Sequence, residues 1–297
     1  MTAISTTAND VRAWIRLLRP RQWAKNGLVF AAPLGAGALL VPSVMGPTLA
    51  AVVAFSAAAS AMYVVNDVMD RERDRVHPVK QNRPVAAGRI SATSALWVAG
   101  LLGALAVVMS VAVATPLLFV IGIYAVLTTL YSLGLKHVSV VDIVVVASGF
   151  VLRAIAGGVA ADVPISSWFL IVTSFGALFV VAGKRYGELI TLSDEGVNHR
   201  PSLDGYTPEY LRYVLTFSSG LAAIAYCLWA FEVPRTGTSQ LLMQLSIVPF
   251  VTALLRYGHI VMQGRGGEPE EVFLKDRELL VLGFIWLAMF GVGVTLG

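Results

Sequence analysis

Long apolar stretches alternate with short polar connections along nearly the whole chain. Each stretch is close to the roughly 20 residues that an α-helix needs to cross a bilayer. The stretches are residues 22–41, 49–69, 91–113, 116–135, 138–160, 166–184, 210–231, 241–262 and 278–296. The pattern therefore predicts an all-α membrane protein of about nine transmembrane helices.

The N-terminal residues follow a different pattern. Residues 1–9 are mostly small and polar, and we expect them to be disordered. Residues 10–19 place Arg12, Arg16 and Arg19 opposite an apolar stripe, which is typical of a helix lying in the membrane interface. That stripe consists of Val11, Trp14, Ile15 and Leu18. Residues 10–297 are predicted to form a single transmembrane domain.

The composition agrees with a membrane protein. The chain is 57% hydrophobic and 13% charged, whereas a soluble domain carries about 25% charged residues. We therefore expect a membrane, and no nucleic acid, as its partner. The single cysteine, Cys227, excludes an intramolecular disulfide, and the four histidines show no metal-binding spacing.

The basic residues predict the orientation. All Lys and Arg residues except Arg153 and Arg235 fall in or beside the N-terminal segment and loops of one side. Because positive charge favours the cytoplasmic side, we expect a cytoplasmic N-terminus in the inner (plasma) membrane. The long polar loops, at about 71–90, 185–209 and 263–277, lie on the same side, so we expect the chemistry there.

An array of acids follows the second apolar stretch. Asp67, Asp70 and Asp74 are spaced i, i+3 and i+7, which places them on one face of a continuing helix, and Asn66 borders that face. Oxygen ligands in this number suit Mg²⁺, which often binds one or two carboxylates together with substrate phosphates. A solvated, charged helix end is the alternative, because arginines interleave with these acids.

A second polar cluster ends the sixth stretch, at Gly183-Lys184-Arg185-Tyr186-Gly187-Glu188. The i, i+4 spacing of Lys184 and Glu188 fits an ordinary ion pair on a helix surface. It equally fits a functional role, in which Glu188 adds a carboxylate to the metal site while Lys184 and Arg185 bind phosphate.

Further cations lie near these clusters. Arg83 precedes Pro84 close to the acids, and either binds phosphate or follows the general charge bias of that side. Arg19, Gln22 and Lys25 lie where the interfacial helix meets the first stretch, at a depth that suits an anionic lipid headgroup or a simple anchor.

The fifth stretch carries two charges within the membrane. Asp142, near its inner end, is expected in the polar cavity. Arg153 lies deeper, where an unpaired charge costs at least about 2.5 kcal/mol. We interpret Arg153 as a structural ion and leave it out of the site.

The array Asn66-Asp67-x-x-Asp70-x-x-x-Asp74, followed by Asn82-Arg83-Pro84, resembles the signature of the UbiA superfamily of intramembrane prenyltransferases. The spans and the polar loops of one side are similar as well. The resemblance implies a UbiA-type helical bundle over nearly the whole chain, with residues 10–297 as one catalytic domain that uses Mg²⁺ and an isoprenoid substrate.

Four further segments look like those of the decaprenyl-phosphate phosphoribosyltransferase branch, which feeds arabinan synthesis for cell-wall arabinogalactan. They are residues 18–26, 134–137, 153–158 and 183–186. This narrower resemblance implies transfer of a 5-phosphoribosyl group from phosphoribosyl diphosphate (PRPP) to decaprenyl phosphate or a similar polyprenyl phosphate. The products would be decaprenyl-phosphoryl-5-phosphoribose and diphosphate.

The residues would divide into four roles in that reaction. The catalytic residues would be Asp67, Asp70 and Asn66, and the Mg²⁺ ligands Asp67, Asp70, Asp74 and Glu188. The PRPP-binding residues would be Lys184, Arg185, Tyr131, Lys136 and Arg83, and the lipid phosphate would contact Arg19, Gln22 and Lys25.

Two other functions stay open at this point. Most UbiA members carry a second aspartate pair where this chain has Lys184 and Glu188, which disfavours the alternative of a prenyl diphosphate donor with an aromatic acceptor. A transporter would need ionisable residues through the middle of several spans, and four of the predicted spans have none. Small residues such as Gly100 and Gly103 favour tight helix packing, and they leave self-association open.

Overall fold

The computed structural model describes residues 11–195, 203, 205–233 and 235–296, and the side chains of residues 192–195 are excepted. The described chain is helical and contains no strand. The long helices are α3 (Pro42–Met69), α5 (Ala92–Val113), α6 (Thr115–Leu133), α7 (Val141–Ala161), α8 (Ser167–Glu195), α9 (Pro208–Glu232), α11 (Ile247–Ile260) and α13 (Arg277–Thr295). The predicted all-α membrane architecture is confirmed, with eight helical segments in the described residues long and apolar enough to span a bilayer.

Shorter helices complete the chain. They are η1 (Pro20–Phe30), α2 (Ala31–Gly35), α4 (Arg71–Arg75), η2 (Lys80–Asn82), η3 (Leu135–His137), α10 (Gly237–Leu245), η4 (Val261–Arg265) and α12 (Pro269–Lys275). The predicted span at 241–262 is therefore built from α10 and α11, which continue into η4 as one membrane-length segment.

The predicted span at 22–41 differs in the structure. It is the 3₁₀-helix η1 followed by the five-residue α2, and Gly37 turns the chain with a φ of 69°. This segment lies so close to α7 that a Cβ on Gly157 would stand 1.7 Å from the Val29 carbonyl oxygen. Hydropathy correctly predicted that the segment is apolar. It carries no information on the close backbone packing against α7, which accompanies the irregular helix.

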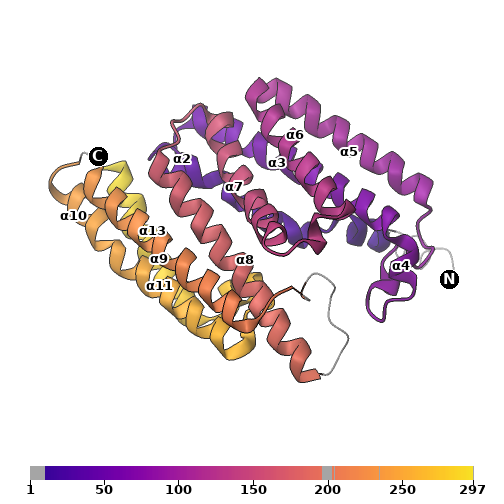
Figure 1. Cartoon of the computed structure of the whole chain (residues 1–297). Coiled ribbons are helices and arrows are strands. Elements are labelled where there is room, and N and C mark those ends of the chain that lie inside the picture. The colour runs from indigo at the N-terminus through magenta and orange to yellow at the C-terminus, as the bar shows by residue number, and fades with distance from the viewer. Residues whose placement is uncertain (1–10, 196–202, 204, 234, 297) are drawn as a thin grey trace, which may run out of the picture.

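The helices form two packed groups that share α7 (Figure 1). The first group, α3, α5, α6 and α7, buries Phe55, Leu117 and Ile121 in a common core. The second, α7, α8, α9 and α11, buries Tyr257, Leu211 and Leu215. Long helices that follow one another in the chain run in opposite directions, so their connecting loops lie at two ends of the bundle.

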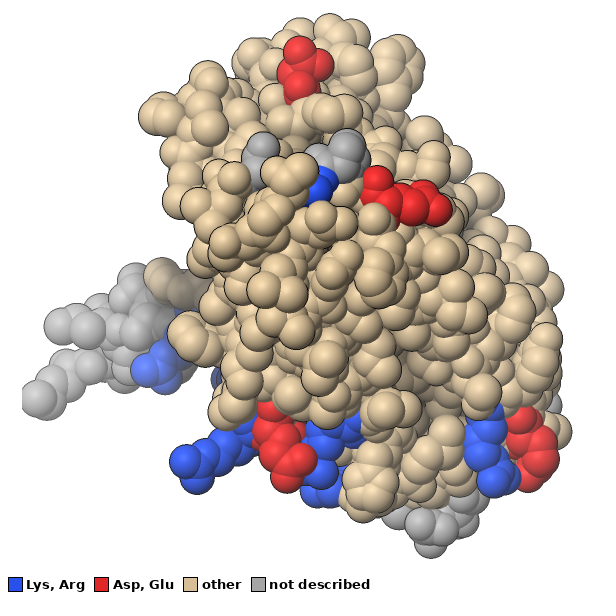
Figure 2. Space-filling model, turned by 90° about the vertical axis from the view of Figure 1, so that its left-hand side faces the viewer, with Lys and Arg blue, Asp and Glu red and all other residues tan. Residues whose placement is uncertain are grey.

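One end carries most of the charged loops, and we call it the polar end. It comprises the end of α3 with α4 and η2, the connection η3, the end of α8, and α12. Figure 2 shows most charged side chains of the visible face at one end, beside a broad band of uncharged residues. The connections from α7 to α8 and from α9 to α10 lie at the opposite end.

The N-terminal helix is present over residues 11–18, while residue 10 and the predicted disordered residues 1–9 lie outside the described part. Ala13 and Leu17 are buried beside Val64 and Val85. Ile15 is 51% exposed. The helix therefore packs on the bundle through one side and presents apolar side chains outward, as an interfacial helix would.

Candidate functional site

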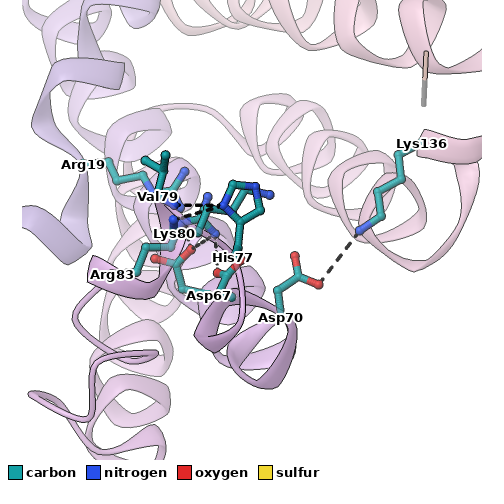
Figure 3. Close-up of polar contacts among 9 residues, drawn as sticks. Arg19, Asp67, Asp70, His77, Val79, Lys80, Arg83 and Lys136 are labelled. Atoms are coloured by element: carbon teal, nitrogen blue, oxygen red, sulfur yellow. Dashed lines mark hydrogen bonds and ion pairs between the residues drawn. The ribbon is translucent and has the colours of Figure 1, made fainter. Parts of the chain in front are cut away.

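Asp67, in the last turn of α3, is the centre of the first polar cluster. Its side chain is 2% exposed, and its Oδ1 accepts hydrogen bonds from Arg19 Nη2 at 2.5 Å and Arg83 Nη1 at 3.0 Å. The same Arg83 nitrogen donates to Asp74 Oδ2 at 2.7 Å. Figure 3 shows the two arginines converging on Asp67 from separate segments. The two guanidinium groups thus neutralise Asp67 and Asp74, and the expected face on one continuing helix is interrupted, because α3 ends at Met69 and Asp74 lies on α4.

The local backbone conformation orients both Arg19 and Arg83 toward Asp67. Arg19 adopts a φ of 52°, a left-handed conformation that costs a non-glycine residue energy and turns the chain from the N-terminal helix into η1. Arg83 is extended, with a ψ of 141°, because the following Pro84 disfavours the helical region. These local conformations bring Arg19, which precedes α3 in the chain, and Arg83, which follows it, into contact with Asp67.

Asp70 faces a different partner. It ends α3, and its Oδ1 lies 4.0 Å from Lys136 Nζ of η3, with both side chains about one-fifth exposed. Figure 3 shows Asp70 pointing away from Arg83 and toward Lys136. Asn66 is half-buried beside Asp67 and has no side-chain partner among the described residues. Asp70 and Asn66 are therefore the least committed oxygen groups at the end of α3.

Arg185, on α8, organises the second polar cluster. Its guanidinium donates to Asp142 Oδ2 at 3.0 Å, to Glu188 Oε2 at 2.9 Å and to the Tyr131 hydroxyl at 2.9 Å. Asp142 is 1% exposed and also accepts a hydrogen bond from the Tyr206 hydroxyl. Burial, reinforced by this hydrogen bond, raises the pKa of Tyr206 well above its ordinary value. Asp142 is thus buried in a hydrogen-bonded network near the polar end, and Arg185 joins α6, α7 and α8.

Lys184 differs from Arg185 because no carboxylate lies within ion-pair distance of it in the described part of the chain. It lies in the electrostatic neighbourhood of Glu188, Lys25 and Glu270. Lys25 in turn binds Glu270 Oε1 at 2.8 Å. Lys184 is thus a cation at the polar end that remains available to a ligand.

Glu270, at the start of α12, is a site residue that the sequence reasoning missed. Burial alone would raise the pKa of Glu270, but the hydrogen bond and charge of Lys25 hold it below its ordinary value. The only sequence signal was an acid in a polar-side loop just after Pro269. The contact joins α12 to η1, which are more than two hundred residues apart in the chain.

Gln22 and Lys25 hold their predicted place on η1. Lys25 is 19% exposed, and Gln22 is half-buried one turn before it. The segment is fastened to α3, since Trp23 Nε1 donates to Ser60 Oγ at 2.9 Å and Asn26 Nδ2 donates to Ser56 Oγ at 2.8 Å. The structure thus brings Arg19, Gln22 and Lys25 together along one short segment.

Arg153 is a deeply buried cation that the site prediction left out. It is 4% exposed, donates from Nε to Asn26 Oδ1 at 2.8 Å and from Nη1 to the Gly149 carbonyl at 2.6 Å. Its guanidinium also stands 4.9 Å from the ring centroids of both Phe55 and Tyr124. Ring faces and neutral acceptors stabilise it, so Arg153 ties α7 to η1 and α3, in agreement with the interpretation of a structural ion.

The four predicted metal ligands do not form one cluster. Among the described residues no three His, Cys, Asp or Glu side chains are grouped closely enough to hold a metal ion. Asp74 is occupied by Arg83, and Glu188 by Arg185. Asp67 is likewise bound by Arg19 and Arg83, so Asp70 is the one of the four without an arginine partner among the described residues. Mg²⁺ needs only one or two carboxylates when phosphates and water supply the rest, so its binding by Asp67 and Asp70 stays a prediction.

Known proteins match this chain over nearly its whole length. Residues 27–288 match the UbiA prenyltransferase family. The chain is 45% identical over 294 residues to the decaprenyl-phosphate phosphoribosyltransferase of Mycobacterium tuberculosis, which covers 98% of this chain and 97% of that protein. It is 45% identical over 279 residues to the protein of the same name from Corynebacterium glutamicum, covering 92% and 84%.

A solved structure supports the fold. A UbiA homolog from Archaeoglobus fulgidus bound to DMAPP and Mg²⁺ gives a TM-score of 0.70 at 20% identity. The superposition covers 95% of this chain and 98% of that one.

Proposed function

Because the chain belongs to the UbiA prenyltransferase family, we propose that it transfers the 5-phosphoribosyl group of PRPP to decaprenyl phosphate. The observation that carries this proposal is the 45% identity, over nearly the full length, to relatives named for that activity. The polar end supports it, since cations there outnumber the acids that are free to bind metal. Two strongly anionic substrates need such an excess of positive charge.

The reaction requires no general base. An anionic oxygen of the lipid phosphate attacks the anomeric carbon of the ribose, while the bond from that carbon to the diphosphate oxygen breaks. The diphosphate leaves with the bonding electron pair, and attack from the opposite face inverts the anomeric carbon. Positive charge develops on the ribose, as at other glycosyl centres. The protein therefore contributes mainly positioning and charge neutralisation.

Asp67 and Asp70 would hold Mg²⁺, with Asn66 as a further oxygen ligand or hydrogen-bond partner. When bound, Mg²⁺ would neutralise the diphosphate as it leaves. In this structure Asp67 binds Arg19 and Arg83, which the anionic substrates would draw away from it as Mg²⁺ binds, whereas Asp74 and Glu188 hold Arg83 and Arg185. Their proposed role is therefore to fix Arg83 and Arg185 rather than to bind the metal directly.

The donor phosphates would contact cations from several elements. Lys184 has no ion-pair partner among the described residues, and Lys136 stands 4.0 Å from Asp70, so both can reach a phosphate close to the metal. Arg83 Nη1 lies 3.0 Å from Asp67 Oδ1, so this guanidinium would also lie beside the donor phosphates. Arg185 donates a hydrogen bond to the Tyr131 hydroxyl, and the two side chains would contact the donor phosphates together.

The lipid phosphate would bind along η1. Arg19, the N-cap of η1, is followed at intervals of three residues by Gln22 and Lys25. Arg19 binds the carboxylate of Asp67, and Lys25 binds that of Glu270. A phosphate entering here would compete with these carboxylates for the cations. Because Asp67 also belongs to the metal pair, this segment would set the two substrates side by side.

The setting in the membrane follows from the substrates. One substrate carries a long isoprenoid confined to the bilayer, and the other is a charged sugar phosphate in water. We propose that the polar end faces the cytoplasm of the plasma membrane, supported by the concentration of Lys and Arg there.

The test is an assay on purified protein with two substrate pairs. We expect product from labelled PRPP with decaprenyl phosphate, and none from a prenyl diphosphate with a phenol. Removing divalent ions with EDTA should abolish turnover, and adding Mg²⁺ should restore it. Glu72→Gln is the matched control for variants of the proposed metal pair Asp67 and Asp70, since Glu72 is an exposed acid of the same region that lies outside the site. Product from the second pair alone would refute the proposal.

A further inference from the structure

A cavity of about 450 Å³ lies at the end opposite the polar end. It is enclosed by α2, the connection from α7 to α8, and parts of α8, α9, α11 and α13. Its size falls within the range of small-molecule sites, about 300–1,000 Å³. Aromatic side chains dominate the wall: Trp168, Phe169, Tyr226, Trp229, Phe250 and Trp286.

The polar atoms of Tyr226 and Trp286 in this wall already have hydrogen-bond partners. The Tyr226 hydroxyl and Ser246 Oγ are 2.7 Å apart, and Trp286 Nε1 donates to the same hydroxyl at 2.8 Å. Tyr226 also stacks on Phe250, with ring centroids 4.1 Å apart. The rings are therefore fixed and offer mainly apolar surface, so the cavity suits a hydrocarbon chain.

Arg235 lines the same cavity and adds a charge. Its Nη1 donates to the carbonyl oxygens of Gly293 and Val294 at 2.8 and 3.2 Å, near the end of α13. Its Nε is the one buried side-chain nitrogen or oxygen without a hydrogen-bond partner in the described residues. Arg235 has no carboxylate within ion-pair distance in the same part of the chain, so its Nε lacks an acceptor and its charge lacks a counter-ion.

We propose that this cavity and Arg235 bind one phospholipid from the leaflet opposite the reaction site. An acyl chain would fill the aromatic cavity, and a phosphate oxygen would accept a hydrogen bond from Nε of Arg235. This site is separate from the polar end, and the inference stands whether or not the proposed phosphoribosyl transfer is correct.

The charges at the rim favour this occupant over the isoprenoid tail of a substrate. A hydrocarbon tail that arrived from the polar end could fill the cavity, but it would bring no acceptor to Arg235. Glu232, exposed near the rim, accepts a hydrogen bond from the cavity residue Trp168 at 2.9 Å. Arg235 in the wall and Glu232 on the wall residue Trp168 offer opposite charges to a zwitterionic head, with phosphate on Arg235 and an ammonium near Glu232, so we commit to phosphatidylethanolamine.

Native mass spectrometry of the full-length protein in detergent tests the proposal. Phosphatidylethanolamine, phosphatidylcholine and phosphatidylglycerol would be added separately. We expect a single retained phosphatidylethanolamine, with at least fivefold lower occupancy in Arg235→Gln. Arg212→Gln is the matched control, because Arg212 is an exposed arginine of α9 bound to Glu209, away from the cavity. Unchanged retention in Arg235→Gln, or equal retention of the three lipids, would overturn the proposal.

A second variant covers the case in which loss of Arg235 destabilises α13. A Cβ on Gly35 would meet Phe169 at an ordinary distance of 3.7 Å, so Gly35→Leu should fill part of the cavity while leaving Arg235 intact. We expect this variant to lose the bound phospholipid as well. If it instead raised the KM for decaprenyl phosphate and not that for a short-chain polyprenyl phosphate, with lipid retention unchanged, the cavity would belong to the substrate tail.

Discussion

Replacing Arg83 with methionine tests whether one cation holds the acidic end of α3 together. A single nitrogen of Arg83 bonds Asp67 and Asp74, whose side chains are 2% and 4% exposed, while Arg83 itself is 24% exposed. Arg83→Met would leave Asp67 with Arg19, but Asp74 would have no described cation within ion-pair distance. Breaking a buried ion pair from one side costs about 3–5 kcal/mol.

The partial exposure of Arg83 and the remaining contact of Arg19 place the expected loss near the lower limit, about 3 kcal/mol. At about 2–4 °C per kcal/mol, this corresponds to a decrease in melting temperature of roughly 6–12 °C. The measurement is thermal unfolding of purified protein in detergent. The double variant Arg83→Met/Asp74→Asn should recover a large part of the loss, because it no longer buries an unpaired carboxylate.

The control is Arg75→Met. Arg75 binds Glu72 on α4, and both side chains are about half exposed or more. Such a surface pair contributes only about 0–1 kcal/mol, so the melting temperature should change little. An Arg83→Met variant as stable as wild type, or a double variant in which the two losses simply add, would show that the shared arginine does not stabilise these acids.

Three further predictions concern the polar end. Asp67→Ala or Asp70→Ala should reduce transfer by at least about a hundredfold while the protein still inserts into membranes, since the metal pair would be lost; near-normal turnover would remove the metal assignment. Lys184→Ala should raise the KM for PRPP more than that for decaprenyl phosphate, and equal increases would refute the division of the phosphate sites. Glu270→Gln should lower stability at pH 7, because a carboxylate whose folded pKa is held down by Lys25 stabilises the fold above its ordinary pKa of 4.5. Its advantage over the variant should vanish as the pH falls through that lowered pKa; an advantage that persists in melting curves at low pH would contradict this role of the ion pair.

The sequence by itself determined the features that depend on local pattern. Hydropathy predicted the membrane helices, because each must be apolar over a bilayer's thickness whatever its neighbours. The short spacing of Asp67, Asp70 and Asp74 placed all three acids at the polar end, but the predicted single helix face was wrong, because α3 ends at Met69 and Asp74 lies on α4. The bias of basic residues identified the polar end in the same way.

The tertiary structure decided the pairings. Arg19 and Asp67 are 48 residues apart, and Lys25 reaches Glu270 across almost the whole chain. No periodicity carries such information, because the partner of a charge depends on how helices pack and which loop folds over their ends. Packing against Gly157 likewise gave residues 22–41 an irregular backbone, and helix ends distant in sequence enclosed the cavity beside Arg235. Local sequence thus set the elements, whereas close contact between distant segments determined which side chains meet.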